Sequence, residues 1–175
     1  MTEQGQMNEQ FSDILEAIKQ KSQQGRMIEI EEKFAQLVIF LLAERYYAFY
    51  GWAIKEIVTV REIAYIPGMP EYILGVIHVR GDIESVLDLR RVMKLPQNVL
   101  TKRSRILLGE TPQLRSGLLV DSVEDVLEIP ETHISEPRSI LEHECMEYIR
   151  GESVYKGREL LILDIEKIFG SLLKQ

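Results

Sequence analysis

The sequence predicts a mostly β protein built from two small five-stranded β-barrels, with short helices and a helical N-terminal extension. The stretch Glu71–Met93 recurs without a gap 76 residues later as Glu147–Phe169, and seven of the 23 aligned positions are identical. Average composition gives roughly one or two identities by chance, so the repeat indicates one structural unit built twice. Short apolar and β-branched runs between turn residues, about five in each copy, are typical of small barrels.

The composition excludes two classes of partner. Hydrophobic residues make up 45% and charged residues 28% of the 175-residue chain, which is ordinary for a globular protein. A net charge of −7 argues against a nucleic-acid surface, which needs a basic stripe. The longest apolar run, Leu37–Ala43, falls far short of the ~20 residues of a membrane-spanning helix. Together with a single cysteine, Cys145, and a polar N-terminus, this predicts a cytoplasmic protein without direct membrane insertion.

Residues 1–33 differ from the rest of the chain and form the predicted N-terminal extension. Phe11, Ile14, Leu15 and Ile18 recur at helical spacing and would form one apolar stripe of an amphipathic helix. A short helix of this kind is not stable alone in water. We therefore expect it either to pack on the protein's own barrel or to serve as a partner-binding arm.

The first subdomain is predicted to span residues 34–97. Leu37–Ala43 and Tyr46–Tyr50 read as the strands of a hairpin that turns at Glu44-Arg45, and Glu56–Glu62 reads as a further strand.

A second hairpin follows in this subdomain. Tyr72–Arg80 and Ile83–Leu87 flank Gly81-Asp82, and glycine at the first central position predicts a type II′ turn. Asp88 is the expected N-cap of the helix that runs from there toward Pro96.

The second subdomain is predicted to span residues 98–175 and to repeat this order. Ser104–Gly109 and Gly117–Val120 read as strands, and Ser122–Ile129 matches Ala53–Val60 in apolar and polar pattern at every position.

The closing hairpin and helix of the second copy also follow the first. Gly157-Arg158 repeats the turn, and Asp164 repeats the cap of a final helix. The extra residues of this copy fall in the loop Pro130–Met146, where Ser139–Cys145 is a candidate short helix.

Each predicted barrel is too small to be stable alone, so we expect two SH3-like barrels that pack against each other about a pseudo-twofold axis. An apolar groove between them would be the natural place for a partner.

The sequence offers little catalytic chemistry. His133, His143 and Cys145 lie near one another, but the pairs C-x₂-C and H-x₃-H that mark zinc sites are absent from the sequence. No phosphate-binding glycine motif occurs, and Asp88 and Asp164 are better explained as helix caps than as paired catalytic carboxylates. We therefore expect no cofactor, no metal and no enzymatic activity.

Arg80 is the exception among the polar residues. It lies at a predicted strand end beside Gly81, and an arginine there can present its guanidinium fork to a partner carboxylate.

Four segments resemble the chemotaxis coupling protein (CheW) family. Tyr72–Gly81 (YILGVIHVRG) is similar to the family signature YIRGVINLRG, and Ile83–Arg90 (IESVLDLR) to IIPVIDLR. Gly117–Ile129 (GLLVDSVEDVLEI) resembles GLLVDSVSEVL, and Tyr148–Ile165 resembles the closing segment YIRG…DGRLVILLDL. The matching order covers residues 36–169.

The resemblance implies one CheW-like domain over residues 34–175 and a non-enzymatic adaptor. It would couple the cytoplasmic tips of chemoreceptors to the regulatory domain of the histidine kinase CheA, with a receptor helix in the groove between subdomains. The family's receptor-binding positions match these residues: Ile54, Glu56, Gly75, Arg80 and Val126.

The chain departs from the family pattern at three points. His78 stands at the asparagine of NLRG, Ser85 at the proline before V-I-D-L-R, and Trp52 adds a bulky aromatic near the presumed groove. These departures leave open an adaptor of a pilus-motility or other chemosensory pathway. A more remote alternative is a small-ligand-binding protein that uses the inter-barrel cleft, with Trp52, nearby tyrosines and His78 as its lining.

Overall fold

The computed structural model describes residues 13–16, 32–138 and 145–174. The chain divides into two compact units, Met1–Glu32 and Lys33–Gln175. In the first unit, residues 13–16 are helical, with Ile14 and Leu15 exposed, whereas Phe11 and Ile18 of the predicted stripe lie outside the described residues.

The second unit is mostly β. Its strands and α-helices follow in the order β1 (Phe34–Leu42), β2 (Arg45–Tyr50), β3 (Ile54–Thr59), β4 (Ile73–Val79), β5 (Asp82–Asp88), α2 (Leu89–Val92), β6 (Arg105–Glu110), β7 (Arg115–Val120), β8 (Ser122–Pro130), β9 (Ile149–Tyr155), β10 (Arg158–Leu163) and α3 (Ile165–Leu172). Short 3₁₀ turns at Gly51–Ala53, Glu131–His133 and Met146–Tyr148 precede or follow strands. The candidate helix at Ser139–Cys145 falls almost wholly within residues 139–144, outside the described residues.

The strands form two five-stranded sheets of the same topology. Sheet A has the order β8-β1-β2-β10-β9, and sheet B has the order β3-β6-β7-β5-β4. When each strand of the first copy is replaced by its repeat mate in the second, one order becomes the other. The sequence repeat is therefore a pseudo-twofold repeat of the fold.

Each sheet draws strands from both copies. The hairpin β1–β2 lies in sheet A with three strands of the second copy, and β6–β7 lies in sheet B with three strands of the first. Parallel pairing of β2 with β10 and of β7 with β5 joins the exchanged hairpins to their new sheets. The division into residues 34–97 and 98–175 therefore marks the repeat in sequence and does not separate the two sheets.

Both sheets curl until their edge strands meet. Ala64, after β3, forms an antiparallel bridge with Val76 on β4, and Ser135, after β8, forms the equivalent bridge with Glu152 on β9. These bridges close each sheet into a small barrel at one point, as the sequence predicts.

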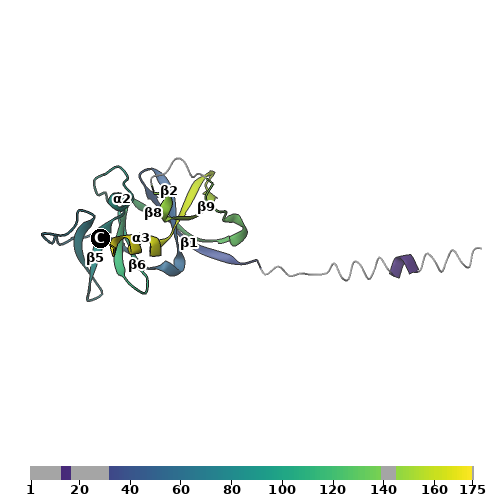
Figure 1. Cartoon of the computed structure of the whole chain (residues 1–175), viewed down its shortest axis with the longest axis horizontal. Helices are drawn as coiled ribbons and strands as arrows, with labels where there is room; N and C mark the ends of the chain where they lie inside the picture. The colour runs from purple at the N-terminus through teal and green to yellow at the C-terminus, as the bar shows by residue number, and fades with distance from the viewer. Residues whose placement is uncertain (1–12, 17–31, 139–144, 175) are drawn as a thin grey trace, which may run out of the picture. The chain divides into compact units, whose positions relative to one another are not determined.

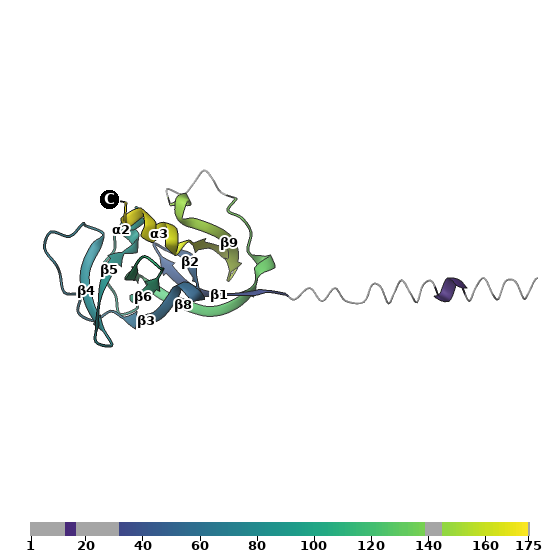
Figure 2. The same cartoon turned by 60° about the horizontal axis from the view of Figure 1, so that its bottom comes forward.

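The described residues of the second unit form three apolar clusters. One lies within sheet A and includes Leu37 and Ile162, and one lies within sheet B and includes Val86 and Ile106. The largest combines strands of both sheets with α3, whose buried face contributes Ile165, Ile168 and Phe169. Both views show α3 between the two groups of strands (Figures 1 and 2). The space between the sheets is therefore a shared hydrophobic core in this region.

The hairpin turns lie one residue earlier than predicted. Val79 pairs with Asp82, so Arg80 and Gly81 are the central residues, with φ angles of 52° and 90°. Two positive φ angles define a type I′ turn, so the predicted type II′ turn at Gly81-Asp82 is wrong. The type I′ turn is favoured because its twist matches that of the flanking strands.

The same shift recurs at the other hairpins. Lys156 and Gly157 are the central residues between β9 and β10, in place of Gly157-Arg158, with φ angles of 48° and 72°. Ala43 and Glu44 connect β1 to β2, in place of Glu44-Arg45, with φ angles of 49° and 65°.

Both predicted N-caps are confirmed by hydrogen bonds at the first turn of their helices. The Asp88 carboxylate accepts a hydrogen bond from the N–H of Arg90 at the start of α2. Asp164 accepts from the N–H groups of Glu166 and Lys167 at the start of α3.

Candidate protein-interaction site

Arg80, in the turn that follows β4, and Glu56, on β3, form an ion pair across the edge of sheet B. The Arg80 Nε lies 3.0 Å from Oε2 and 3.2 Å from Oε1 of Glu56. The arginine side chain is 80% exposed and the glutamate side chain 29% exposed. The hydrogen bond that Arg80 donates to Glu56, followed by the negative charge of Glu56, raises the pKa of the Arg80 guanidinium, so this group stays cationic.

The ion pair borders a groove between β3 and β4. The bridge between Ala64 and Val76 joins these edges at one point, and Glu56 with Arg80 joins them farther along. A groove of about 750 Å³ lies along the two strands, and His78 is part of its lining. The site therefore combines exposed charge with two strand edges.

Ile54 and Ile57 extend the site along β3 in different ways. Ile54 is half-buried and packs against the shared core, so it supports the surface from beneath. Ile57 lines the groove and is 38% exposed, which makes it the larger apolar contact available to a partner. Sequence reasoning missed Ile57, although the match of Ala53–Val60 to Ser122–Ile129 pairs it with Val126.

Gly75 is buried on β4 and presents no side chain to a partner. Its φ is 145°, and a Cβ added there would lie 2.2 Å from the carbonyl oxygen of Ala64. Glycine is required because the β4 backbone passes against the segment that closes the barrel. Gly75 thus shapes the site through the backbone.

Val126 lies in the other sheet. It is on β8, opposite Val38 of β1, and is 47% exposed. The structure therefore brings Glu56 and Arg80 into contact, places Ile54 and Gly75 on the same two strands, and leaves Val126 as an exposed apolar residue on sheet A.

The repeat supplies a second version of the charged pair with different contacts. Asp125 and Lys156 stand at the positions of Glu56 and Arg80, but Tyr155 replaces Val79 between them. The Tyr155 hydroxyl donates to the Asp125 carboxylate over 3.2 Å, and the Lys156 ammonium lies 5.0 Å from the centroid of the Tyr155 ring. Both barrels are thus joined at their edges by side chains, but the described residues at these two equivalent positions form an arginine–carboxylate pair in sheet B and a tyrosine-mediated contact in sheet A.

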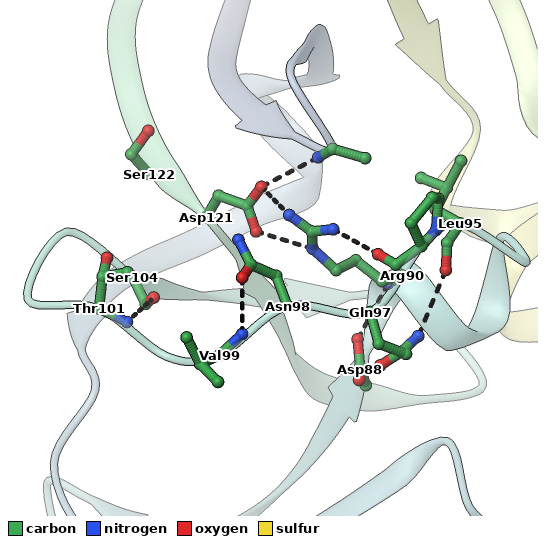
Figure 3. Close-up of polar contacts among 12 residues, drawn as sticks. Asp88, Arg90, Leu95, Gln97, Asn98, Val99, Thr101, Ser104, Asp121 and Ser122 are labelled. Carbon is green, nitrogen blue, oxygen red and sulfur yellow. Dashed lines mark hydrogen bonds and ion pairs between the residues drawn. The ribbon is translucent and has the colours of Figure 1, made fainter.

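A partly buried ion pair ties the two copies together away from the groove. Arg90 of α2 donates through Nε to Asp121 over 2.9 Å and through Nη2 to the same carboxylate, and its Nη1 donates to the carbonyl of Pro96. Asp121 also accepts from the backbone N–H of Ala43 over 2.9 Å. Figure 3 shows Arg90 at the centre of these contacts. We call this group the Arg90–Asp121 clasp.

Comparison with known proteins identifies the fold's family. The CheW-like domain family matches residues 36–173. This chain belongs to the CheW-like domain family. A crystal structure of the scaffolding protein TtCheW from Thermoanaerobacter tengcongensis has a TM-score of 0.71 and 29% identity, over 78% of this chain and 93% of that one.

Curated relatives support the same assignment. The chemotaxis protein CheW of Treponema pallidum is 28% identical over 81% of this chain and 85% of its own length. The CheW protein of Helicobacter pylori is 27% identical over 93% of this chain and 97% of its own length. As a CheW-like protein, this chain is an adaptor, or scaffold, of chemotaxis-type signal transduction.

Metal sites and membrane-spanning helices are two other features to consider in this CheW-like protein. Among residues 13–16, 32–138 and 145–174, no group of three or more His, Cys, Asp and Glu side chains is placed to hold a metal ion. His133 is described, whereas His143 lies outside the described residues. In the same part of the chain, no helix is long and apolar enough to cross a membrane.

Proposed function

We propose that this protein couples the cytoplasmic tip of a chemoreceptor to the regulatory domain of the histidine kinase CheA. The receptor would contact the surface formed by Ile54, Glu56, Gly75, Arg80 and Val126. The observation that carries this proposal is the exposed ion pair between Glu56 and Arg80 at the edge of a groove.

Arg80 is well placed to bind a further acceptor. Its described contact with Glu56 uses Nε, one of the guanidinium donors, while the side chain remains 80% exposed. The remaining N–H groups can form paired hydrogen bonds with a carboxylate or carbonyl of a receptor helix. Glu56 restricts the orientation of the guanidinium before the partner arrives, which lowers the entropy cost of binding.

Apolar contacts would supply much of the affinity. Val126 and Ile57 are exposed on β8 and β3, where they could pack against apolar residues of the receptor helix. Ile54 and Gly75 would act from beneath, by packing and by fixing the path of β4. This division of roles fits interfaces in which a few residues provide most of the binding energy.

The test is titration of the protein with a receptor cytoplasmic-tip fragment by isothermal titration calorimetry. We expect Arg80→Ala to weaken binding by about 1–3 kcal/mol, within the range for an interface anchor. Thermal stability should change little, because exposed ion pairs contribute about 0–1 kcal/mol.

Lys156→Ala is the matched control. It removes a cationic side chain from the equivalent turn of sheet A, where Lys156 also has a positive φ. Unchanged affinity in Lys156→Ala with a loss in Arg80→Ala supports the proposal. Equal losses in affinity and melting temperature for Arg80→Ala would show a structural role instead.

A second candidate function keeps the adaptor role in another chemosensory pathway. The protein FrzA of Myxococcus xanthus is 29% identical over 48% of this chain and 52% of its own length. A pull-down against the organism's kinases and receptors would identify the circuit. Deletion of residues 1–33 in the same assay tests the partner-binding arm, and unchanged recovery of the kinase would remove that segment from the mechanism.

We also infer that the protein has no catalytic activity and that it acts in the cytoplasm, at membrane-associated receptor arrays. This inference is supported by the match to the CheW-like domain family and by the similarity to a solved scaffolding protein. A fluorescent fusion should form clusters that depend on the receptors. Reproducible thermal shifts with nucleotides or metals would instead favour the small-ligand alternative.

A further inference from the structure

His78 lies in the groove beside the proposed receptor contact. It is exposed on β4 and lines the same groove as Glu56 and Arg80. His78 and Val76 point to the same face of β4, opposite to Ile77 and Val79, because side chains alternate along a strand. Ile77 and Val79 are buried in the sheet B cluster, which directs the imidazole away from the core.

The other charges of the groove balance. Its lining contains two carboxylates, Glu56 and Glu62, and two guanidinium groups, Arg61 and Arg80. His78 is the remaining titratable side chain among the lining residues. A protonated imidazole would give these lining residues a net positive charge, and a neutral imidazole would leave their charges balanced.

The fold does not need histidine at this position. The repeat mate of His78 is Val154 on β9, which is 72% exposed and lines a groove beside the other barrel. Two barrels of the same topology therefore form with imidazole in one and isopropyl in the other. The imidazole is available for binding because neither its burial nor its packing is required for closure.

We propose that His78 is a specificity-determining residue that recognises a carboxylate on the receptor helix. An imidazole N–H donates to that carboxylate, and protonation converts the contact into a charge-assisted hydrogen bond. Arg80, two residues farther along in the turn that follows β4, holds the helix in register. This inference rests on the proposed function, because the partner is the same receptor tip.

The groups that face His78 determine how its charge acts. Arg80 lies in the turn that follows the same strand, and Glu56, Arg61 and Glu62 lie across the groove on β3 and the segment after it. On β5, Ile83 is directly opposite His78 in the ladder, between Asp82 and Glu84. Glu84 is buried and paired with Arg115 over 2.9 Å, so it is already neutralised by that contact.

The test is calorimetric titration of the full chain with a receptor-tip fragment at pH 6.0 and pH 8.0. We expect the wild type to bind about three- to tenfold more tightly at pH 6.0, the range of one exposed charge-assisted contact. His78→Val, which installs the residue of the second copy, should lower the affinity at pH 6.0 by a similar factor and remove most of the pH dependence. His78→Asn should keep a neutral donor and also lose the pH dependence.

Val154→Ala provides the control for an exposed side chain on the equivalent strand and should bind like the wild type. If the wild type binds but His78→Val matches it at both pH values, this inference is wrong while the proposed function stands. If the wild type does not bind the fragment at either pH, the proposed function and this inference both fail. Unchanged melting temperatures would show that the variants report on binding.

Discussion

At the scale of single residues, Gly75 shows how the barrel constrains the candidate site. The backbone of β4 bends past the carbonyl of Ala64, to which the N–H of Val76 donates over 3.0 Å. A side chain at Gly75 would meet that carbonyl and would also require a positive φ. The position of Arg80, five residues along the same hairpin, depends on this approach.

Gly75→Ala should therefore destabilise the protein by about 2–5 kcal/mol, from backbone strain together with the steric overlap. The free energy of unfolding is measured by urea denaturation. Gly68→Ala is the control, because Gly68 also has a positive φ but an added Cβ there meets nothing within 4 Å. It should cost only about 1–2 kcal/mol. Equal costs would mean that the close approach to Ala64 contributes nothing.

Tyr47 links stability to alkaline pH. Burial, and next its interaction with Cys145, raises the pKa of the Tyr47 hydroxyl from 10.0 to about 12. The unfolded chain therefore releases this proton at lower pH than the folded protein, so the stabilisation is complete below pH 10 and is lost as pH rises toward 12. The shift corresponds to about 2–3 kcal/mol.

Tyr47→Phe should remove that component of the alkaline loss. Its unfolding free energy should fall less than that of the wild type between pH 10 and pH 12, whatever its value at pH 8. Parallel curves for the two proteins would contradict a titrating role for this hydroxyl.

Residue roles set by local rules could be predicted from the sequence, whereas roles set by packing could not. Asp88 and Asp164 were predictable as caps because an N-cap needs only a short acceptor before a helix. Tyr155 carried no such signal, because its hydroxyl meets Asp125 only after β8 and β9 come together. Ile57 could have been found from the repeat, which pairs it with Val126.

At the scale of elements, strands were predicted well and turns less well. A glycine between two strands fits either a type I′ turn as its second central residue or a type II′ turn as its first. The sequence around Gly81 allows both, and strand pairing decides between them by matching Val79 with Asp82. This decision matters for function because it places Arg80 inside the turn with a positive φ.

α3 tests the energetic importance of a predicted cap. The Asp164 carboxylate accepts hydrogen bonds from two backbone N–H groups, over 3.0 Å and 3.2 Å, and three residues of the helix are buried in the shared core. Asp164→Ala should lower the free energy of unfolding by about 1 kcal/mol, and Asp164→Asn should lower it less, because asparagine also caps well. Urea denaturation of both variants measures the difference, and equal losses would point to the charge of Asp164 instead of its cap.

At the scale of the whole molecule, the repeat predicted two equivalent barrels but not which strands each would contain. Similarity between two copies shows that their units fold alike, and it is silent on whether a hairpin pairs within its own copy. Here β1–β2 and β6–β7 change places, so each barrel needs both halves of the chain. Neither half can therefore complete its sheet alone, and we expect residues 34–97 and 98–175 to be insoluble or unfolded when produced separately.

The Arg90–Asp121 clasp should stabilise this exchanged arrangement, because it joins α2 of the first copy to the β7–β8 junction of the second and to the β1–β2 turn. The Arg90 side chain is only 9% exposed, so its removal leaves Asp121 without its cationic partner in a partly buried place. Arg90→Ala should therefore lower the free energy of unfolding by about 2–4 kcal/mol. Arg103→Ala is the control, because it breaks a 2.9 Å pair between Glu124 and a largely exposed arginine, and it should cost under about 1 kcal/mol.

The double variant Arg90→Ala with Asp121→Ala should be less destabilised than the sum of the two single variants, because it leaves no unpaired buried charge. Additive losses, or equal losses for Arg90→Ala and Arg103→Ala, would show that the clasp contributes no more than an ordinary surface ion pair.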